Sequence, residues 1–106
     1  ETQLKQVLIN LIKNALEALE KIAEPKLDIA VKRILNHVSV EISDNGEGIP
    51  AEILEKIFVP FYSTKAEGSG IGLSLSRQII RKHGGQISVV SRQGKGTTFS
   101  ISLPVE

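Results

Sequence analysis

Residues 38–50 read VSVEISDNGEGIP, an alternating segment that runs directly into a glycine-rich loop. Apolar residues occupy every second position of its first half, which predicts a strand with one buried face. The alternation places Asp44 on that same face, where a carboxylate is costly unless a hydrogen-bond donor meets it. Gly46 and Gly48 leave bare backbone beside this carboxylate. The narrow space that they line suits a flat ring with an exocyclic amine, such as adenine. An Asx-turn, in which Asp44 caps its own turn, explains the residue equally well.

The sequence before and after this segment predicts three helices and three further strands. Apolar residues at helical spacing mark the helices, and period-two alternation marks the strands, each of which is expected to be half-buried. A single sheet with helices packed on one side is the economical arrangement, a two-layer α/β sandwich. The expected helices span residues 4–22, 50–58 and 71–83, the expected strands 27–31, 38–43, 87–90 and 97–103, and the turns 36–37 and 91–96.

The composition fits one compact domain spanning residues 1–106. Apolar residues make up 41% and charged residues 24%, so disorder is not the expected state. Lys and Arg number 13 against 12 Asp and Glu, and this balance argues against a strongly basic surface that binds nucleic acid. The absence of Cys excludes thiol chemistry, and the presence of only two His argues against a His-rich metal site. The chain has no apolar run long enough for a membrane span, no signal peptide and no initiator Met, so we expect a piece of a longer protein.

Asn10 and Asn14 stand one turn apart at the edge of the apolar stripe of the first expected helix. Half-buried amides usually just satisfy nearby hydrogen bonds, so on position alone the structural role is favoured. The other reading is that these amides aim neutral oxygens at a cation.

Gly68, Gly70 and Gly72 precede and open the third expected helix. Glycines at a helix N-terminus let backbone N–H groups approach a phosphate with the help of the helix dipole, although glycine-rich loops are also common without a ligand. Thr97 is expected to face inward on the last strand, where a hydroxyl without a partner is penalised.

Other nucleotide-binding and metal-binding motifs fail on single residues. A P-loop needs Ser or Thr after its Gly-Lys pair, whereas Lys95 is followed by Gly96. The glycines at 46 and 48 follow a hairpin and lack the third glycine of a dinucleotide-binding turn. A calcium loop starting at Asp44 would need glycine where Ile49 stands.

Five stretches, in order, resemble the motifs of the catalytic ATP-binding domain of bacterial sensor histidine kinases. That domain belongs to the ATPase superfamily shared with gyrase, heat-shock chaperones and MutL. The resemblance implies the Bergerat-type fold, with a mixed, mostly antiparallel sheet and three helices on one face. The stretches are residues 6–15 (N box), 44–49 (G1 box), 58–65 (F box), 68–74 (G2 box) and 94–99 (last glycine motif).

The resemblance also implies a role for individual residues. Asn14 should bind a Mg²⁺ ion that bridges the ATP phosphates, and Asn10 should support it or touch phosphate. Asp44 should accept a hydrogen bond from the adenine amino group, with Thr97 helping through water. The other implied ATP-binding positions are Gly46, Gly48, Ile49, Lys65, Gly70, Gly72 and Leu73.

This chain departs from the family pattern in three places. It lacks the phosphate-accepting histidine, because His37 is expected in a hairpin turn and His83 at a helix end. Both are interpreted as structural, and no catalytic residue is assigned. The family has strand segments before the first helix, so we expect a free sheet edge here. The lid, residues 65–69, is shorter than in many relatives.

The implied function is to bind Mg-ATP and present the γ-phosphoryl group to a histidine on the helical dimerisation domain of the same protein, in two-component signal transduction. A response regulator is the implied downstream partner, with no nucleic acid and no direct membrane contact. We expect a cytoplasmic, monomeric fragment that cannot autophosphorylate alone, from a homodimeric parent with or without a membrane anchor. The alternatives are an anti-sigma-type serine kinase and an ATP-gated clamp, which would usually carry a general-base Glu where Asn10 stands.

Overall fold

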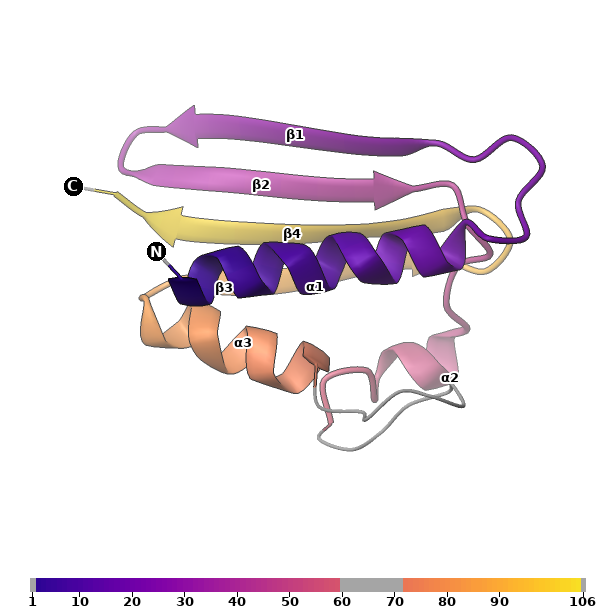
Figure 1. Cartoon of the computed structure of the whole chain (residues 1–106). Coiled ribbons are helices and arrows are strands. Elements are labelled where there is room, and N and C mark those ends of the chain that lie inside the picture. Colours follow the sequence, from indigo (N-terminus) through magenta and orange to yellow (C-terminus); the bar gives the residue numbers. More distant parts are fainter. Residues whose placement is uncertain (1, 60–71, 106) are drawn as a thin grey trace.

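A computed structural model describes residues 2–59 and 72–105, and it contains one four-stranded sheet with helices against it (Figure 1). In chain order the elements are α1 (Thr2–Ala18), β1 (Leu27–Ile34), β2 (His37–Asp44), α2 (Ala51–Leu54), α3 (Gly72–Lys82), β3 (Gln86–Arg92) and β4 (Gly96–Pro104). The strand order is β1-β2-β4-β3, and every neighbouring pair is antiparallel. The expected two-layer α/β sandwich is therefore confirmed, and the described sheet is wholly antiparallel where a mixed sheet was expected.

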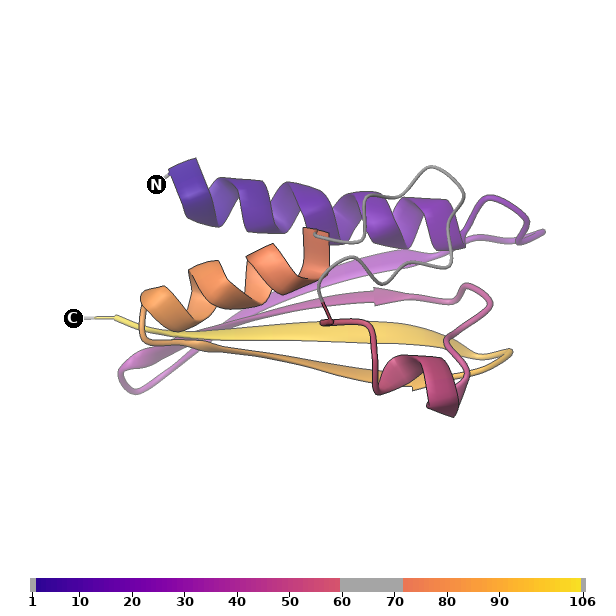
Figure 2. The ribbon, with the colours of Figure 1, turned by 90° about the horizontal axis from the view of Figure 1, so that it is seen from below.

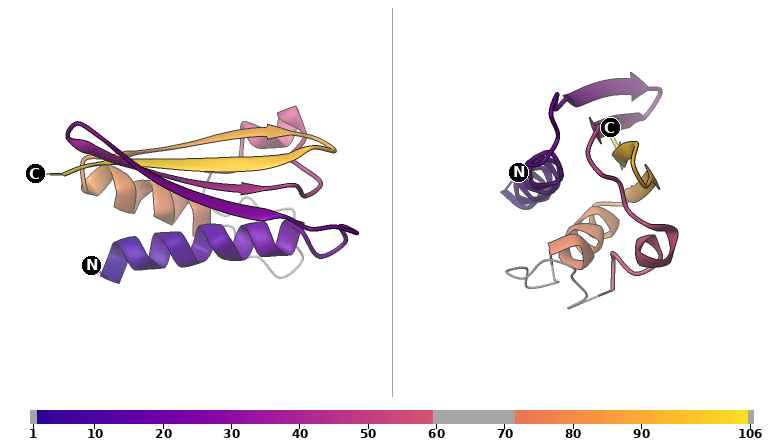
Figure 3. Two further views of the ribbon diagram at one scale, coloured as in Figure 1. Left: turned by 90° about the horizontal axis from the view of Figure 1, so that it is seen from above. Right: turned by 90° about the vertical axis from the view of Figure 1, so that its right-hand side faces the viewer.

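The helix layer consists mainly of α1 and α3. Figures 2 and 3 show both helices on the same side of the sheet, where α1 packs on β2, α3 packs on β3, and the two helices pack on each other. They run antiparallel, because α1 begins at the end of the molecule where α3 ends (Figure 1). The short α2 stands apart from both (Figure 2). The segment that follows α2 contacts α3, since the guanidinium of Arg77 lies 5.0 Å from the ring centroid of Phe58.

Apolar residues between the two layers form the core. The inward face of β4 alternates as expected, because Thr97, Phe99 and Ile101 are buried. β4 is the last strand in the chain, yet it is paired on both sides. Fully burying a large aliphatic side chain contributes about 1.5–3 kcal/mol. The largest side chains that are fully buried are Val7 and Leu11 of α1, Ile42 of β2, Ile80 of α3 and Ile101 of β4.

β1 differs from the half-buried strand that its alternation predicts. Ile29 lies opposite the buried Ile42, and Val31 lies opposite Val40, so both point to the helix-facing side of the sheet. They are nevertheless 51% and 66% exposed, because the described helices pack chiefly on β2 and β3. Among the described strands β1 pairs only with β2 and β3 only with β4, so both are edge strands of the described sheet.

Several boundaries differ from the sequence-based expectation, since β1 continues to Ile34 and α2 ends at Leu54. α1 ends at Ala18, four residues early, and continues as turns in which the N–H of Leu19 donates to the carbonyl of Leu16. His37 was expected in a turn but is the first residue of β2. Ser91 was also expected in a turn but belongs to β3. This last difference changes the composition of the candidate site.

α3 buries a serine and exposes a leucine. Leu75, expected on its apolar stripe, is 46% exposed, whereas Ser76 is 3% exposed. The helix ends in a glycine cap. Gly84 has a φ of 81°, and the N–H of Gly85 donates to the carbonyl of Ile80 at 2.9 Å, which is the pattern of a Schellman cap.

Candidate functional site

Three polar residues form a row across one end of the sheet. Asp44, at the end of β2, lies opposite Thr97 in β4, and Thr97 lies opposite Ser91 in β3. Directly paired residues place their side chains on the same side of a sheet. Because Thr97 belongs to the buried face of β4, the whole row faces the helix layer.

The carboxylate of Asp44 is partly buried and is held by backbone donors. The N–H of Gly46 donates to its Oδ1 at 2.9 Å, and the backbone N–H of Thr97 donates to it as well. Burial raises the pKa of the Asp44 carboxyl above its ordinary value, and the two hydrogen bonds pull this pKa partly back. The bond to Gly46 is an Asx-turn contact, so Asp44 does cap its own turn. A carboxylate has about four lone-pair sites, so the turn leaves acceptor capacity for a ligand.

Ser91 is the member of the row that sequence reasoning missed. Its hydroxyl lies 2.8 Å from the hydroxyl of Thr97, accepts the N–H of Ile49 at 2.8 Å, and donates to the carbonyl of Gly96 at 3.0 Å. The turn-like composition of residues 91–96 hid its place in the strand. Continuing the alternation of Ile87 and Val89 by one more step would have found it.

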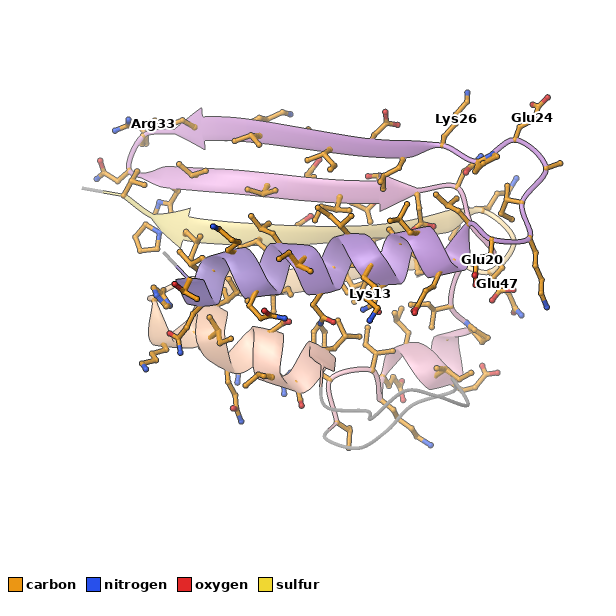
Figure 4. All side chains as sticks on the ribbon, in the orientation of Figure 1. Lys13, Glu20, Glu24, Lys26, Arg33 and Glu47 are labelled. Carbon is orange, nitrogen blue, oxygen red and sulfur yellow. The ribbon has the colours of Figure 1, made fainter. Side chains whose placement is uncertain are left out.

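The loop between β2 and α2 is fixed at both sides. Asn45 accepts the N–H of Lys26 at 2.7 Å through Oδ1 and donates to the carbonyl of Glu24 at 3.0 Å through Nδ2. Figure 4 shows the side chains of Glu24 and Lys26 pointing outward, so these contacts use only their backbone. On the other side, the N–H of Gly94 donates to the carbonyl of Glu47 at 2.7 Å. The loop beside Asp44 is therefore anchored without a ligand.

Gly46 and Gly48 are required by this packing. A Cβ on Gly46 would lie 2.7 Å from the carbonyl oxygen of Ala18 and 2.8 Å from Oδ1 of Asp44. A Cβ on Gly48, whose φ is 74°, would collide with the carbonyl of Arg92. The bare backbone that the sequence indicates beside Asp44 is present, but neighbouring protein already occupies much of the space.

Asn10 links the two long helices. Its Nδ2 donates to Oγ of Ser76 in α3 at 3.1 Å, which explains why a serine is buried there. The helices are antiparallel, so one turn onward from this bond leads to Asn14 on α1 and to Gly72 on α3, in the same direction. That direction is toward Ala18, which contacts Gly46 of the Asp44 loop. The Asn14 amide and the α3 N-terminus thus lie on the Asp44 side of the molecule.

The donor set suits a magnesium ion bound through phosphate. Among residues 2–59 and 72–105, no group of three His, Asp or Glu could enclose a metal. Mg²⁺ commonly keeps waters and phosphate oxygens and takes only one or two protein oxygens. A neutral amide such as that of Asn14, half-buried on α1, is compatible with that coordination.

Only some of the remaining expected positions lie among the described residues. Leu73 in the first turn of α3 packs against the core, and Ile49 does so from the loop. Lys65, Gly70 and the expected lid at 65–69 lie outside the described residues. None of the helices that the structure describes combines the length and hydrophobicity needed to cross a bilayer.

The two-layer fold places a partly buried Asp at the end of its second strand and a glycine-opened helix beside α1, an arrangement compatible with a nucleotide site. The family model of histidine kinase-, DNA gyrase B- and HSP90-like ATPases matches residues 1–106, and the chain belongs to this family. Its relatives place it in the histidine-kinase branch.

Those relatives are sensor kinases of greater length. Sporulation kinase C of Bacillus subtilis (strain 168) is 41% identical over 106 residues, which are 100% of this chain and 24% of that protein. Sensor histidine kinase ZraS of Escherichia coli (strain K12) is 41% identical over 97% of this chain and 22% of that protein. The chain thus spans about a quarter of the length of each of these two relatives.

Solved structures agree with this placement. The catalytic domain of histidine kinase ThkA is 42% identical with a TM-score of 0.84, and the match covers 97% of this chain and 66% of that chain. The mycobacterial sensor histidine kinase MprB is 28% identical with the same TM-score of 0.84, over 97% of this chain and 72% of that chain.

Proposed function

We propose that this domain binds Mg-ATP and presents the γ-phosphoryl group for transfer to a histidine on a separate helical domain of the same protein. The observation that carries the proposal is the partly buried Asp44 carboxylate, held at the end of the sheet nearest the Asn14 amide and the α3 N-terminus. An acceptor at one pole and a cation ligand with helix-end N–H groups at the other match the two ends of ATP.

At the adenine pole, Asp44 accepts a hydrogen bond from the exocyclic amine. Its two backbone donors hold it in place and favour its charged form, against the larger effect of burial on its pKa. Thr97 lies next to it in the row and contributes its hydroxyl, directly or through water. Adenine stacks against the apolar surface that borders the loop, where Ile49 is half-buried.

At the phosphate pole, Asn14 and the N-terminus of α3 act together. Asn14 supplies the amide oxygen for Mg²⁺, and Gly72 begins a helix whose positive end faces the phosphates. Bound Mg²⁺ would neutralise phosphate charge and so favour transfer. Asn10, whose Nδ2 is committed to Ser76, holds the two helices at the spacing that this arrangement needs.

The domain acts by positioning, and the nucleophile is supplied from elsewhere. Phosphoryl transfer depends mainly on alignment and charge stabilisation. Both histidines lie away from the proposed site, because His83 follows the end of α3 opposite Gly72 and His37 begins the strand that Asp44 ends. We propose a helical dimerisation domain of a homodimeric parent as the acceptor and a response regulator as the next partner. An amide at position 10 cannot serve as the general base of an ATP-hydrolysing clamp.

Asp44→Asn should weaken ATP binding by about 2–3 kcal/mol, because the change places an amide donor against the adenine amine. Calorimetric titration with Mg-ATP measures the loss. Asp28→Asn is the matched control, since Asp28 lies on the neighbouring strand but is exposed. Equal affinity of Asp44→Asn and the parent would remove Asp44 from the site.

Asn14→Ala should reduce the dependence of ATP affinity on Mg²⁺ while leaving binding in EDTA nearly unchanged. The amide oxygen is a hard ligand, and its loss affects only the metal-bound form. Titrations with and without Mg²⁺ separate the two contributions. Lys13→Ala, on the exposed side of α1, controls for effects on the helix (Figure 4). An unchanged response to Mg²⁺ contradicts the assignment.

The transfer step is tested by mixing this domain with the helical domain of its parent protein and labelled ATP. Label should appear on a histidine of the helical domain, and Asp44→Asn should lower the rate at subsaturating ATP. If the domain binds ATP but no histidine becomes labelled, the binding assignment stands and the histidine-kinase reaction fails.

A further inference from the structure

We propose that Ser91 is a positioning residue for nucleobase specificity, because it fixes the direction in which the Thr97 hydroxyl points its proton. The inference rests on the proposed binding of adenine at Asp44. Ser91 lies two strands away from Asp44, in β3, and reaches the site only through Thr97.

The direction of each hydrogen bond follows from counting protons. A serine hydroxyl has one proton to give and two lone pairs to receive. Ser91 donates its proton to the carbonyl of Gly96 at 3.0 Å and accepts the N–H of Ile49 at 2.8 Å. One lone pair remains for the hydroxyl of Thr97, 2.8 Å away, so all three contacts of Ser91 are satisfied together only when Thr97 is the donor in that bond.

The consequence is that Thr97 is an acceptor toward everything else. Its only proton is committed to Ser91, so any further bond that Oγ1 forms uses a lone pair. Ionised Asp44 next to it is also acceptor-only. The row therefore presents two acceptors in succession, which matches the two N–H protons of an adenine amine. It rejects a base with a carbonyl at that place, such as hypoxanthine.

Ser91 can hold this direction because both of its other partners are backbone groups. The carbonyl of Gly96 and the N–H of Ile49 belong to the strand end and the anchored loop, and neither can exchange donor for acceptor. Without the serine oxygen, the Thr97 hydroxyl rotates and can offer its proton to a ligand carbonyl. The expected change is a loss of discrimination, beyond any general loss of affinity.

The experiment compares the dissociation constants of ATP and inosine triphosphate by calorimetry. For Ser91→Ala we expect the dissociation constant of inosine triphosphate divided by that of ATP to fall about five- to tenfold, the effect of one redirected hydrogen bond. This quotient is called the ratio below. Ser91→Thr keeps the hydroxyl and should keep the ratio. Ser88→Ala, an exposed serine of the same strand, is the matched control and should leave both constants unchanged.

A second variant isolates the path through Thr97. Thr97→Val preserves shape but has no hydroxyl, so adding Ser91→Ala to it should cause no further change in the ratio. If Ser91→Ala does not fold, Thr97→Val by itself must still lower the ratio. An unchanged ratio in Ser91→Ala, with both nucleotides equally weakened, means that Ser91 only anchors the loop, and overturns the inference. Failure of the parent domain to prefer ATP would instead overturn the proposed role of Asp44.

Discussion

The β1–β2 and β3–β4 hairpins form the two halves of one sheet, and they differ in what lies against them. In β3 the helix-facing residues Ile87, Val89 and Ser91 are half-buried under α3 or joined to the site. In β1 the equivalent face carries Ile29 and Val31, which are largely exposed. Both strands alternate with period two and both lie at a sheet edge.

The turns of the two hairpins differ in the same way. The β3–β4 turn carries Gly94 with a φ of 84°, and its N–H is bonded to the carbonyl of Glu47 in the loop beside Asp44. The β1–β2 turn places Leu35 at a φ of 53°, fully on the surface. Alternation therefore indicates which face of a strand is apolar, whereas the elements packed against that face decide whether it is buried.

The largest expected effect compares the helix-facing side chains of β1 and β2 at one register position. Ile42→Ala should lower the free energy of unfolding by about 2–5 kcal/mol, because Ile42 is 1% exposed and its removal leaves a cavity. Ile29→Ala, directly opposite it, should lower this free energy by about 1 kcal/mol or less. Urea unfolding of both variants gives the two values. Similar losses would mean that β1 is covered in solution.

The next effect tests the attachment of the loop to the β3–β4 hairpin. Gly48→Ala should destabilise by about 2–4 kcal/mol, from its positive φ and from the collision with the Arg92 carbonyl. Gly94→Ala has the same backbone strain but open space around its Cβ, so about 1–2 kcal/mol is expected. Thermal and urea unfolding of the pair measure the difference. Equal losses would show that strain alone acts at Gly48.

A smaller effect is expected in the opposite direction at the β1–β2 turn. Leu35→Gly should stabilise the domain by about 0.5–1 kcal/mol, because relief of the left-handed conformation exceeds the extra entropy of glycine in the unfolded chain. Leu35→Ala keeps the strain and serves as the control. A loss of stability in Leu35→Gly would contradict this account of the turn.

The smallest effect is the pH dependence of stability from Asp44. Its ordinary pKa is 3.8 and burial raises the pKa in the folded protein. The contribution of the group is therefore fully present below pH 3.8 and is lost as the pH rises through the folded-state pKa. Relative to Asp44→Asn, the parent should lose stability across that window and stay level above it. Parallel curves for the two proteins would contradict the shift in pKa.

Part of the candidate site could be predicted residue by residue. Alternation alone placed Asp44 and Thr97 on the inward faces of their strands, and the register confirms that they are neighbours. It failed for Ser91, because the glycines at 94 and 96 dominate the local composition and made residues 91–96 resemble a single turn. Helical spacing failed for Leu75 and Ser76 of α3, where a buried serine accepts a hydrogen bond from Asn10 of another helix.

The order of the elements, their apolar faces and the positions of the glycines follow from local patterns, because helix and strand periodicity and turn chemistry are local. Long-range pairing places β4 between β2 and β3, and this brings Asp44, Thr97 and Ser91 into one row. Tertiary packing also places the helices over β2 and β3 and leaves the inward face of β1 exposed. These outcomes depend on contacts between residues distant in the chain, whose energies no local pattern contains.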